Sequence, residues 1–258
     1  MVFFFDGLKM SDTPRGAADN YQLMNNEDIK KMPVSSIADP DGAILALWVP
    51  SSLLQEGLDV MKAWGFNHKQ TYIWVKNKKS PYDTFKKFLT KNFIKNLPTV
   101  FDKNSYKDII KSIQVSLKDL DMNDCLAFGM GRLFRQCHEI CLVGINNNKI
   151  YKHLSNKSQR SVSFSENLKH SIKPENLQNS LDLMFPGDIN KIELFARRQR
   201  KGWYCFGNES PMTKGEDIYK SLQKVTSISE DQFFNIKTIL SNYQSTDNQK
   251  LYEEWNKI

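Results

Sequence analysis

The chain has 258 residues, of which 40% are hydrophobic and 25% charged, enough to bury the core of one α/β domain with additions. Its formal net charge of +7 favours an anionic partner such as nucleic acid. No apolar run approaches the roughly 20 residues of a membrane span, and the four cysteines form no CxxC pair that would indicate zinc. We therefore expect an intracellular protein with free thiols and no metal.

The first part of the chain predicts strands and helices in alternation. A short strand, Val2–Phe5, begins so abruptly that we expect the natural chain to extend further upstream. After a short helix that stops before Pro33, the nearly continuous apolar run at 43–49 predicts a strand covered on both faces. A helix at 50–65 and a strand at 69–76 follow. This order is typical of a doubly wound α/β sheet.

Residues 80–124 interrupt this order. They carry two lysine-rich amphipathic stretches, 82–97 and 105–120, which predict an inserted helical hairpin. The pattern favours helices packed on their own domain with lysines in solvent, and the alternative is docking of nucleic acid or a partner protein. The candidate residues for nucleic acid contact are Lys86, Lys87 and Lys91, and those for partner contact are Phe85, Phe88 and Phe93.

The second part of the chain returns to the same order. The polar stretch 146–169 predicts a mobile loop. From residue 210 onward the chain is polar, and its helical patterns indicate an appendage without catalytic residues. The expected strands lie at 140–144, 192–196 and 203–206, and the expected helices at 174–184, 218–225 and 231–240.

Several polar residues directly follow predicted strands. Ligands of open α/β sheets bind beyond the carboxyl ends of the strands, which singles out Asp6, Arg197, Asn208 and the stretch around Lys173. A carboxylate there could accept hydrogen bonds from an amine, and an arginine could hold a carboxylate, a phosphate or a ribose hydroxyl. Each also has a structural interpretation, Asp6 as part of a turn and Arg197 as a surface residue.

A series of segments carries a family resemblance. They lie in order at residues 3–6, 17–21, 45–49, 63–66, 74–76, 129–131, 139–144, 170–175, 193–197 and 202–209. Over residues 2–209 the chain resembles the N6-adenine methyltransferases, which include the eukaryotic mRNA adenosine methyltransferase and small phage enzymes. The resemblance implies a Rossmann-like, S-adenosylmethionine-dependent methyltransferase fold for 1–209. In it, 80–124 form a helical insertion and 210–258 a helical C-terminal appendage.

The chain departs from this family at the loop after the first strand. The family reads Asp-Pro-Pro-Trp there, a stiff loop that accepts the hydrogens of the adenine amine and stacks on the base. This chain reads Asp6, Gly7, Leu8 and Lys9. The carboxylate remains, but glycine removes the rigidity, and loss of the stacking ring alone costs about 1–3 kcal/mol. We therefore expect no methylation of adenine by this chain alone.

The family positions that contact the cofactor are only partly informative. Lys173, Arg197 and Asn208 fall on positions that contact the methionine carboxylate and the ribose of S-adenosylmethionine. They indicate either residual cofactor binding or vestigial residues kept for structure. No cofactor is assigned to the chain itself, and S-adenosylmethionine is expected on a catalytic partner.

The resemblance also implies a function. The eukaryotic members work as heterodimers in which a degenerate subunit supports an active one. We expect this chain to be such a subunit, nuclear, helping to bind the nucleic acid substrate, DNA rather than RNA. Two alternatives stay open: an active methyltransferase that uses Asp6 with another acceptor amine, and a nucleic acid-binding module without enzymatic role.

Overall fold

The computed structural model describes the backbone of Val2–Phe5 and, beyond it, most of the chain. The described residues are 24–78, 83–84, 86–88, 90–91, 105–118, 121–131, 133–166 and 172–258. The chain forms two compact units. The first comprises 1–73, 139–163 and 170–258, and the second comprises 74–138 and 164–169.

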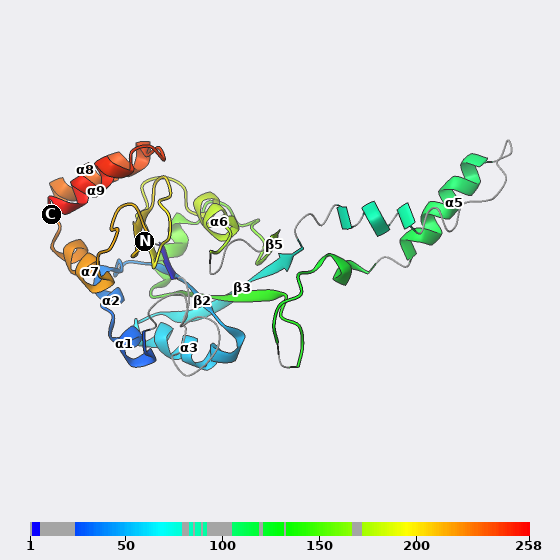
Figure 1. Cartoon of the computed structure of the whole chain (residues 1–258). Helices are drawn as coiled ribbons and strands as arrows, with labels where there is room; N and C mark the ends of the chain where they lie inside the picture. Colours follow the sequence, from blue (N-terminus) through cyan, green and yellow to red (C-terminus); the bar gives the residue numbers. More distant parts are fainter. Residues whose placement is uncertain are drawn as a thin grey trace. The chain divides into compact units, whose positions relative to one another are not determined.

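The strands form one mixed sheet (Figure 1). Its order is β5 (Val162–Glu166), β3 (Asn67–Asn77), β4 (His138–Ile145), β2 (Ile44–Val49), β1 (Val2–Phe5), β6 (Lys191–Leu194) and β7 (Tyr204–Phe206). The pairs β1–β2, β1–β6 and β6–β7 are parallel, whereas β4 runs antiparallel to β2. This arrangement is the α/β methyltransferase-like sheet that the sequence predicts.

Helices cover both faces of the sheet (Figure 1). Every side chain of β2 is buried, and alternate residues point to opposite faces. Leu45 and Leu47 belong to the main hydrophobic core with α3 (Leu54–Ala63), which follows the 3-10 turn η1 (Ser51–Leu53). On the other face α6 (Asn176–Met184) contacts β6 through its buried residue Gln178. The expected strand covered on both faces is therefore confirmed.

Five further α-helices belong to the described part of the first unit. Next to α3 lies α1, and the Trp64 indole donates a hydrogen bond to the Ile29 carbonyl (3.0 Å), whereas α2 contacts α7. Trp255 is 1% exposed, with its ring centroid 5.1 Å from that of Phe206 in β7. The C-terminal helices thus bury side chains against the sheet. The bounds of the five helices are α1 (Asn26–Lys31), α2 (Val34–Ile37), α7 (Ile218–Ser227), α8 (Glu230–Asn242) and α9 (Asn248–Asn256).

The second unit contains the insertion. Its described helix α5 (Ser105–Lys118) confirms the second predicted helix, and helical residues between 83 and 91 agree with the first. The short 3-10 helix η2 (Met122–Cys125) precedes β4. The division at residue 209 stays a prediction.

One predicted segment is wrong. Residues 146–169 were expected as a mobile loop, but they contain the 3-10 helix η3 (Asn148–His153) and β5, and 167–169 lie outside the described residues. The reason is that Asn146, Ser155 and Ser161 form hydrogen bonds with distant parts of the chain, which sequence periodicity does not reveal.

Three further features of the described residues concern membrane-spanning helices, metal sites and disulfides. No helix among them is long and apolar enough to cross a membrane. No group of three or more His, Cys, Asp or Glu side chains among them could hold a metal ion. All four cysteines are free, and Cys137 alone of the four is not buried.

A carboxylate, Glu216, joins the C-terminal helices. Its Oε2 accepts hydrogen bonds from the Trp255 indole (2.8 Å) and the Ser221 hydroxyl (2.7 Å), and its Oε1 pairs with Lys224 Nζ at 2.9 Å. Lys224 Nζ also lies 5.2 Å from the Trp255 ring centroid. Burial opposes ionisation of Glu216, but the hydrogen bonds from Ser221, Trp255 and Lys224 outweigh it, so its pKa lies below the usual value.

We predict that Glu216→Gln lowers the free energy of unfolding by about 1–3 kcal/mol at neutral pH, because three donors lose a charged acceptor. Since folding lowers this pKa, the stabilisation is complete above the usual value of 4.5 and disappears as the pH falls through the lowered value. Urea unfolding across this range should show the two proteins converging in acid. The matched control Glu253→Gln, on the exposed face of α9, should change stability by less than about 0.5 kcal/mol.

Candidate functional site at the carboxyl edge of the parallel strands

The parallel strands end together at one edge of the sheet. Phe5 of β1 is paired with Leu47 and Leu194, and Leu194 is paired with Phe206. Because β4 is antiparallel to β2, with Ile140 opposite Val49, β4 begins at this same edge. The segments that follow β1, β2, β6 and β7 therefore meet the start of β4, as the strand-end rule predicts.

The chain exits from β6 and β7 are held close together. Phe195 has a φ of 60°, a left-handed conformation that is strained for a bulky residue. The next residue, Ala196, donates its N–H to the Phe206 carbonyl at 2.9 Å. A Cβ on Gly207 would lie 2.3 Å from the Ala196 carbonyl oxygen, so only glycine fits there. Arg197 and Asn208 follow these two exits.

Hydroxyl groups fix the loop after β7. The buried Thr213 hydroxyl accepts a hydrogen bond from the Gly207 N–H (2.9 Å) and donates one to the Gly207 carbonyl (3.0 Å). The buried Ser210 hydroxyl donates to the Cys205 carbonyl at 2.6 Å. The backbone carbonyl of Asn208 accepts a hydrogen bond from the Gly215 N–H (3.1 Å), and the residue is exposed. An amide on a fixed backbone is thus presented to solvent.

Lys173 enters the same edge from the segment before α6. It is 8% exposed, and its ammonium lies 3.0 Å from the Glu139 carboxylate at the start of β4. The ammonium is also 5.9 Å from the ring centroid of Trp48, which is 1% exposed. Arg198 donates a hydrogen bond to the Lys173 carbonyl at 3.1 Å, which fixes the backbone.

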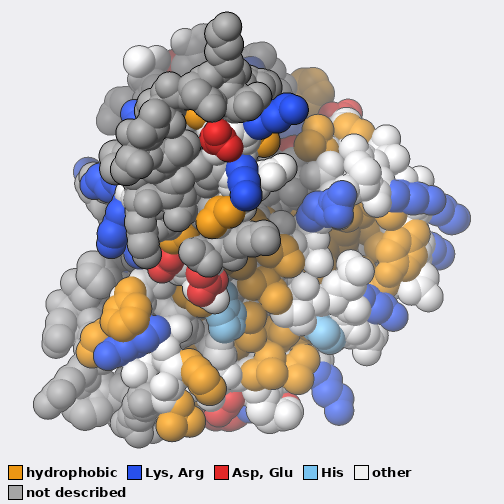
Figure 2. Space-filling model, turned by 90° about the vertical axis from the view of Figure 1, so that its right-hand side faces the viewer, with side chains coloured by type: hydrophobic (Ala, Val, Ile, Leu, Met, Phe, Trp, Pro, Cys, Tyr) orange, Lys and Arg blue, Asp and Glu red, His pale blue; other side chains and the backbone are white. Residues whose placement is uncertain are grey.

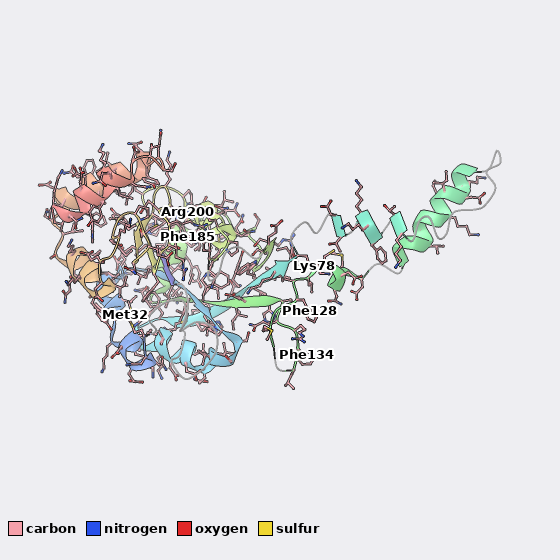
Figure 3. All side chains as sticks on the ribbon, viewed as in Figure 1. Met32, Lys78, Phe128, Phe134, Phe185 and Arg200 are labelled. Carbon is pink, nitrogen blue, oxygen red and sulfur yellow. The ribbon has the colours of Figure 1, made fainter. Side chains whose placement is uncertain are left out.

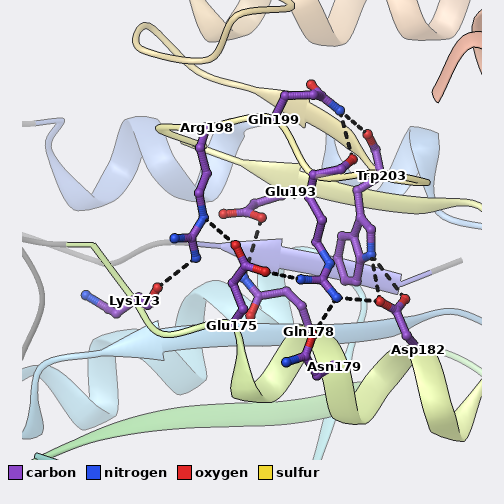
Figure 4. A network of polar contacts seen from close by, with 10 residues as sticks. Lys173, Glu175, Gln178, Asn179, Asp182, Glu193, Arg198, Gln199 and Trp203 are labelled. Carbon is purple, nitrogen blue, oxygen red and sulfur yellow. Dashed lines mark hydrogen bonds and ion pairs between the residues drawn. The ribbon is translucent and has the colours of Figure 1, made fainter. Parts of the chain in front are cut away.

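A chain of ion pairs holds these segments to α6 (Figure 4). Arg198 Nε lies 2.9 Å from one oxygen of Glu175, and Arg200 pairs with the other oxygen. Arg200 also reaches Asp182 at 2.7 Å, and the Trp203 indole donates to Asp182 at 3.1 Å. The turn between β6 and β7 is therefore fixed to α6 by paired charges.

Both candidate cofactor-binding cations have carboxylate partners within the chain. Lys173 pairs with Glu139, and Arg197 Nη1 lies 3.3 Å from Glu209 Oε1. The carboxylate of S-adenosylmethionine would have to compete with both. The residues present therefore do not fit that ligand well, and Asn208 is the one candidate of the three whose side chain reaches solvent from an exposed residue.

Sequence reasoning missed the two acidic partners. Glu209 directly follows the candidate residue Asn208, and Glu139 directly precedes the predicted strand 140–144. Their role depends on the sheet register, which brings the start of β4 and the exits of β6 and β7 to one edge. Placing each acidic residue on the predicted sheet, next to the strand ends that carry the candidate cations, could have identified them.

The other candidate residues are described only in part. Asp6, Gly7, Leu8 and Lys9, together with Phe85 and Phe93, lie outside the described residues. Phe88 is half-buried, and Lys86, Lys87 and Lys91 are exposed and line one shallow depression. On the face shown in Figure 2, the described lysine and arginine side chains are spread among hydrophobic and uncharged ones.

Comparison with known proteins agrees with the fold. Residues 9–98 and 100–209 match the MT-A70 family. The chain belongs to the MT-A70 family. It is 24% identical over 191 residues to an N(6)-adenosine-methyltransferase MT-A70-like protein of Drosophila melanogaster, an alignment that covers 73% of this chain. The MT-A70 chain spans only 24% of the length of that relative. The expected resemblance is thus confirmed at the level of the family.

We predict that this MT-A70 chain binds S-adenosylmethionine weakly or not at all, because Lys173 and Arg197 are neutralised by Glu139 and Glu209. Isothermal titration calorimetry with the purified chain measures the affinity. A micromolar affinity that disappears in Asn208→Ala would show a working pocket and contradict the prediction. The exposed control Asn242→Ala, on α8, should leave any such signal unchanged.

Proposed function

We propose that the chain is the non-catalytic subunit of an N6-adenine methyltransferase complex in the nucleus. In this role it supports an active MT-A70 partner and helps to bind the substrate, DNA rather than RNA. The observation that carries the proposal is the sequence Asp6, Gly7, Leu8, Lys9, which replaces the family's Asp-Pro-Pro-Trp loop directly after β1. Within the family, the non-catalytic subunit of the ciliate DNA methyltransferase complex is the counterpart we propose.

The chemistry of the reaction explains why this replacement matters. The adenine amine is a poor nucleophile, and catalysis depends on holding it in position with its hydrogens accepted by the loop. A displacement of about 1 Å can slow such a reaction on the order of 100-fold. Glycine and lysine in place of proline and tryptophan remove both the stiffness and the stacking surface, so methyl transfer is assigned to the partner.

An exposed apolar loop in the second unit supports a protein partner. Residues 126–137 connect η2 to β4 and present Phe128 (76% exposed), Met130 (87%), Leu133 (93%) and Phe134 (87%) to solvent (Figure 3). A cluster of this kind is costly to leave in water and marks an interaction surface. Phenylalanine and methionine are also enriched at protein interfaces.

The same loop is held in shape before any partner arrives. At its base the Ala127 N–H donates to the Lys76 carbonyl, and the backbone N–H of Lys76 donates to the Cys137 carbonyl, each at 2.7 Å. Near its tip a Cβ on Gly131 would lie 1.9 Å from the Phe134 carbonyl oxygen, so the turn requires glycine. A preformed loop loses little conformational entropy on binding. We therefore place the partner contact on this loop together with the apolar face of the insertion that includes Phe85, Phe88 and Phe93.

The proposal is tested by reconstitution. The purified chain alone should transfer no methyl group to adenine in DNA or RNA, and it should raise the rate of a co-purified MT-A70 subunit that keeps an intact Asp-Pro-Pro-Trp loop. Turnover by the chain alone that is abolished by Asp6→Ala would instead support the active methyltransferase. Absence of any effect on the partner, with nucleic acid binding retained, would support the binding module.

We predict that Phe128→Ala with Phe134→Ala separates the subunits and silences the partner, because interface energy is concentrated in a few apolar anchors. Size-exclusion chromatography and methyl transfer measure the two effects, and circular dichroism should show an unchanged fold. The matched control changes Phe234 and Leu183, which are 69% and 56% exposed on α8 and α6. A double variant that still co-elutes with a fully active partner would exclude this interface.

We predict that reversing Lys86, Lys87 and Lys91 to glutamate weakens nucleic acid binding of the complex across all sequences. These exposed cations would neutralise phosphates, so the loss of affinity should come with a flatter dependence on salt. Fluorescence anisotropy at several salt concentrations measures both. Unchanged affinity and slope would leave these lysines as solvent-exposed residues of the insertion.

A further inference from the structure

A basic segment of the first unit has no role in the function proposed so far. Residues 146–161 contain Lys149, Lys152, Lys157 and Arg160, and the sequence has no Asp or Glu between residues 140 and 165. The segment, which we call the basic strap, includes η3 and leads into β5. It lies apart in the sequence from the lysines of the insertion and belongs to the other unit.

Contacts along its length fix the backbone of the basic strap. Asn146 accepts a hydrogen bond from the Ala43 N–H at 2.6 Å, and the side chain of Ile150 is 2% exposed. Further along, Ser155 donates its N–H to the Met184 carbonyl at the end of α6, and Ser161 accepts from the Ile73 N–H in β3, each at 2.8 Å. The strap is therefore preorganised, and binding through its side chains would not require ordering of the main chain.

The cations of the strap outnumber the carboxylates that interact with them. Asp41 pairs with Lys149 at 2.6 Å, and the charge of Lys152 also contributes to lowering the pKa of Asp41. Across the described ranges, no ion pair or hydrogen bond engages the side chains of Lys152, Lys157 or Arg160, and all three residues are exposed. This contrasts with the carboxyl edge, where Lys173 and Arg197 have carboxylate partners. Unpaired cations on a fixed backbone favour a polyanion.

We propose that the basic strap binds the phosphate backbone of the nucleic acid, as a second contact besides the insertion. The inference rests on the proposed function, which supplies the nucleic acid. Lys152 and Arg160 are eight residues apart and so cannot lie more than about 28 Å from each other. That is within one turn of duplex DNA, roughly 34 Å. The three cations can therefore contact phosphates of one short segment of duplex.

The side chains around these cations favour nucleic acid over other anionic surfaces. Asparagine, serine and glutamine, which commonly donate hydrogen bonds to phosphates, fill most of the remaining positions of the strap. Tyr151, at 50% exposure, is the large hydrophobic residue that the strap presents to solvent. One aromatic ring is little apolar surface for a membrane, and lysine is depleted at protein interfaces.

The test compares two triple variants of the full chain. Lys152→Gln, Lys157→Gln and Arg160→Gln remove the strap charges, and Lys201→Gln, Lys220→Gln and Lys250→Gln remove three exposed cations elsewhere in the same unit. Fluorescence anisotropy with labelled duplex DNA, single-stranded DNA and RNA gives the affinity over a range of salt. We expect the strap variant to lose about tenfold in affinity and to reduce the salt slope by about 2–3, since each phosphate contact contributes about 0.9 to the slope.

Three results would overturn the inference. They are equal affinity and slope for the strap variant and the wild-type chain, an equal loss in the control variant, and no nucleic acid binding by the wild-type chain. Partner activation is measured separately with the same proteins. If the strap variant loses nucleic acid affinity but the wild-type chain activates no partner, the strap is supported as a nucleic acid contact and the proposed function is contradicted. If both variants activate the partner fully and bind nucleic acid with unchanged affinity, the proposed function is supported and the role of the strap is contradicted.

Discussion

The first unit depends on the parallel pairing of β1, a strand of four residues, with β2 on one side and β6 on the other. Without β1 the sheet would separate into β5-β3-β4-β2 and β6-β7, and neither part would keep the shared edge. The same pairing sets the register of Leu47 and Leu194 and so aligns the chain exits that carry Arg197 and Asn208. Fold and candidate site thus follow from one set of backbone hydrogen bonds.

The local sequence pattern predicted the elements whose apolar residues form a continuous run or follow the helical period. The apolar run around β2 and the helical spacing of α3 were sufficient, because all of β2 and one face of α3 are buried. It failed for η3 and β5, whose positions are fixed by contacts such as that of Asn146 with Ala43, about a hundred residues away in the sequence. It also missed α9, whose polar sequence buries only Leu251 and Trp255.

The sequence predicted that Arg197 and Asn208 follow strand ends, but it did not predict which charged residues would pair with the candidate cations. The rule on strand ends led to Arg197 and Asn208, and the structure places both at the expected edge. Whether a cation there is available to a ligand depends on which carboxylates the register brings to it, and this is a tertiary property. In the sequence Glu139 is far from Lys173, and nothing marks Glu209 as the partner of Arg197. In the folded sheet Glu139 pairs with Lys173 and Glu209 pairs with Arg197.

The pairing of Arg197 with Glu209 has a consequence for how such chains are classified. A signature that counts basic residues at family positions would score Arg197 as available to a ligand. In the folded chain its guanidinium already has a carboxylate partner, so the ion pair links the chain exits of β6 and β7 whether or not a ligand binds. The presence of a basic residue at such a position is therefore not by itself a measure of ligand binding, and the carboxylates that the fold brings beside it have to be counted as well.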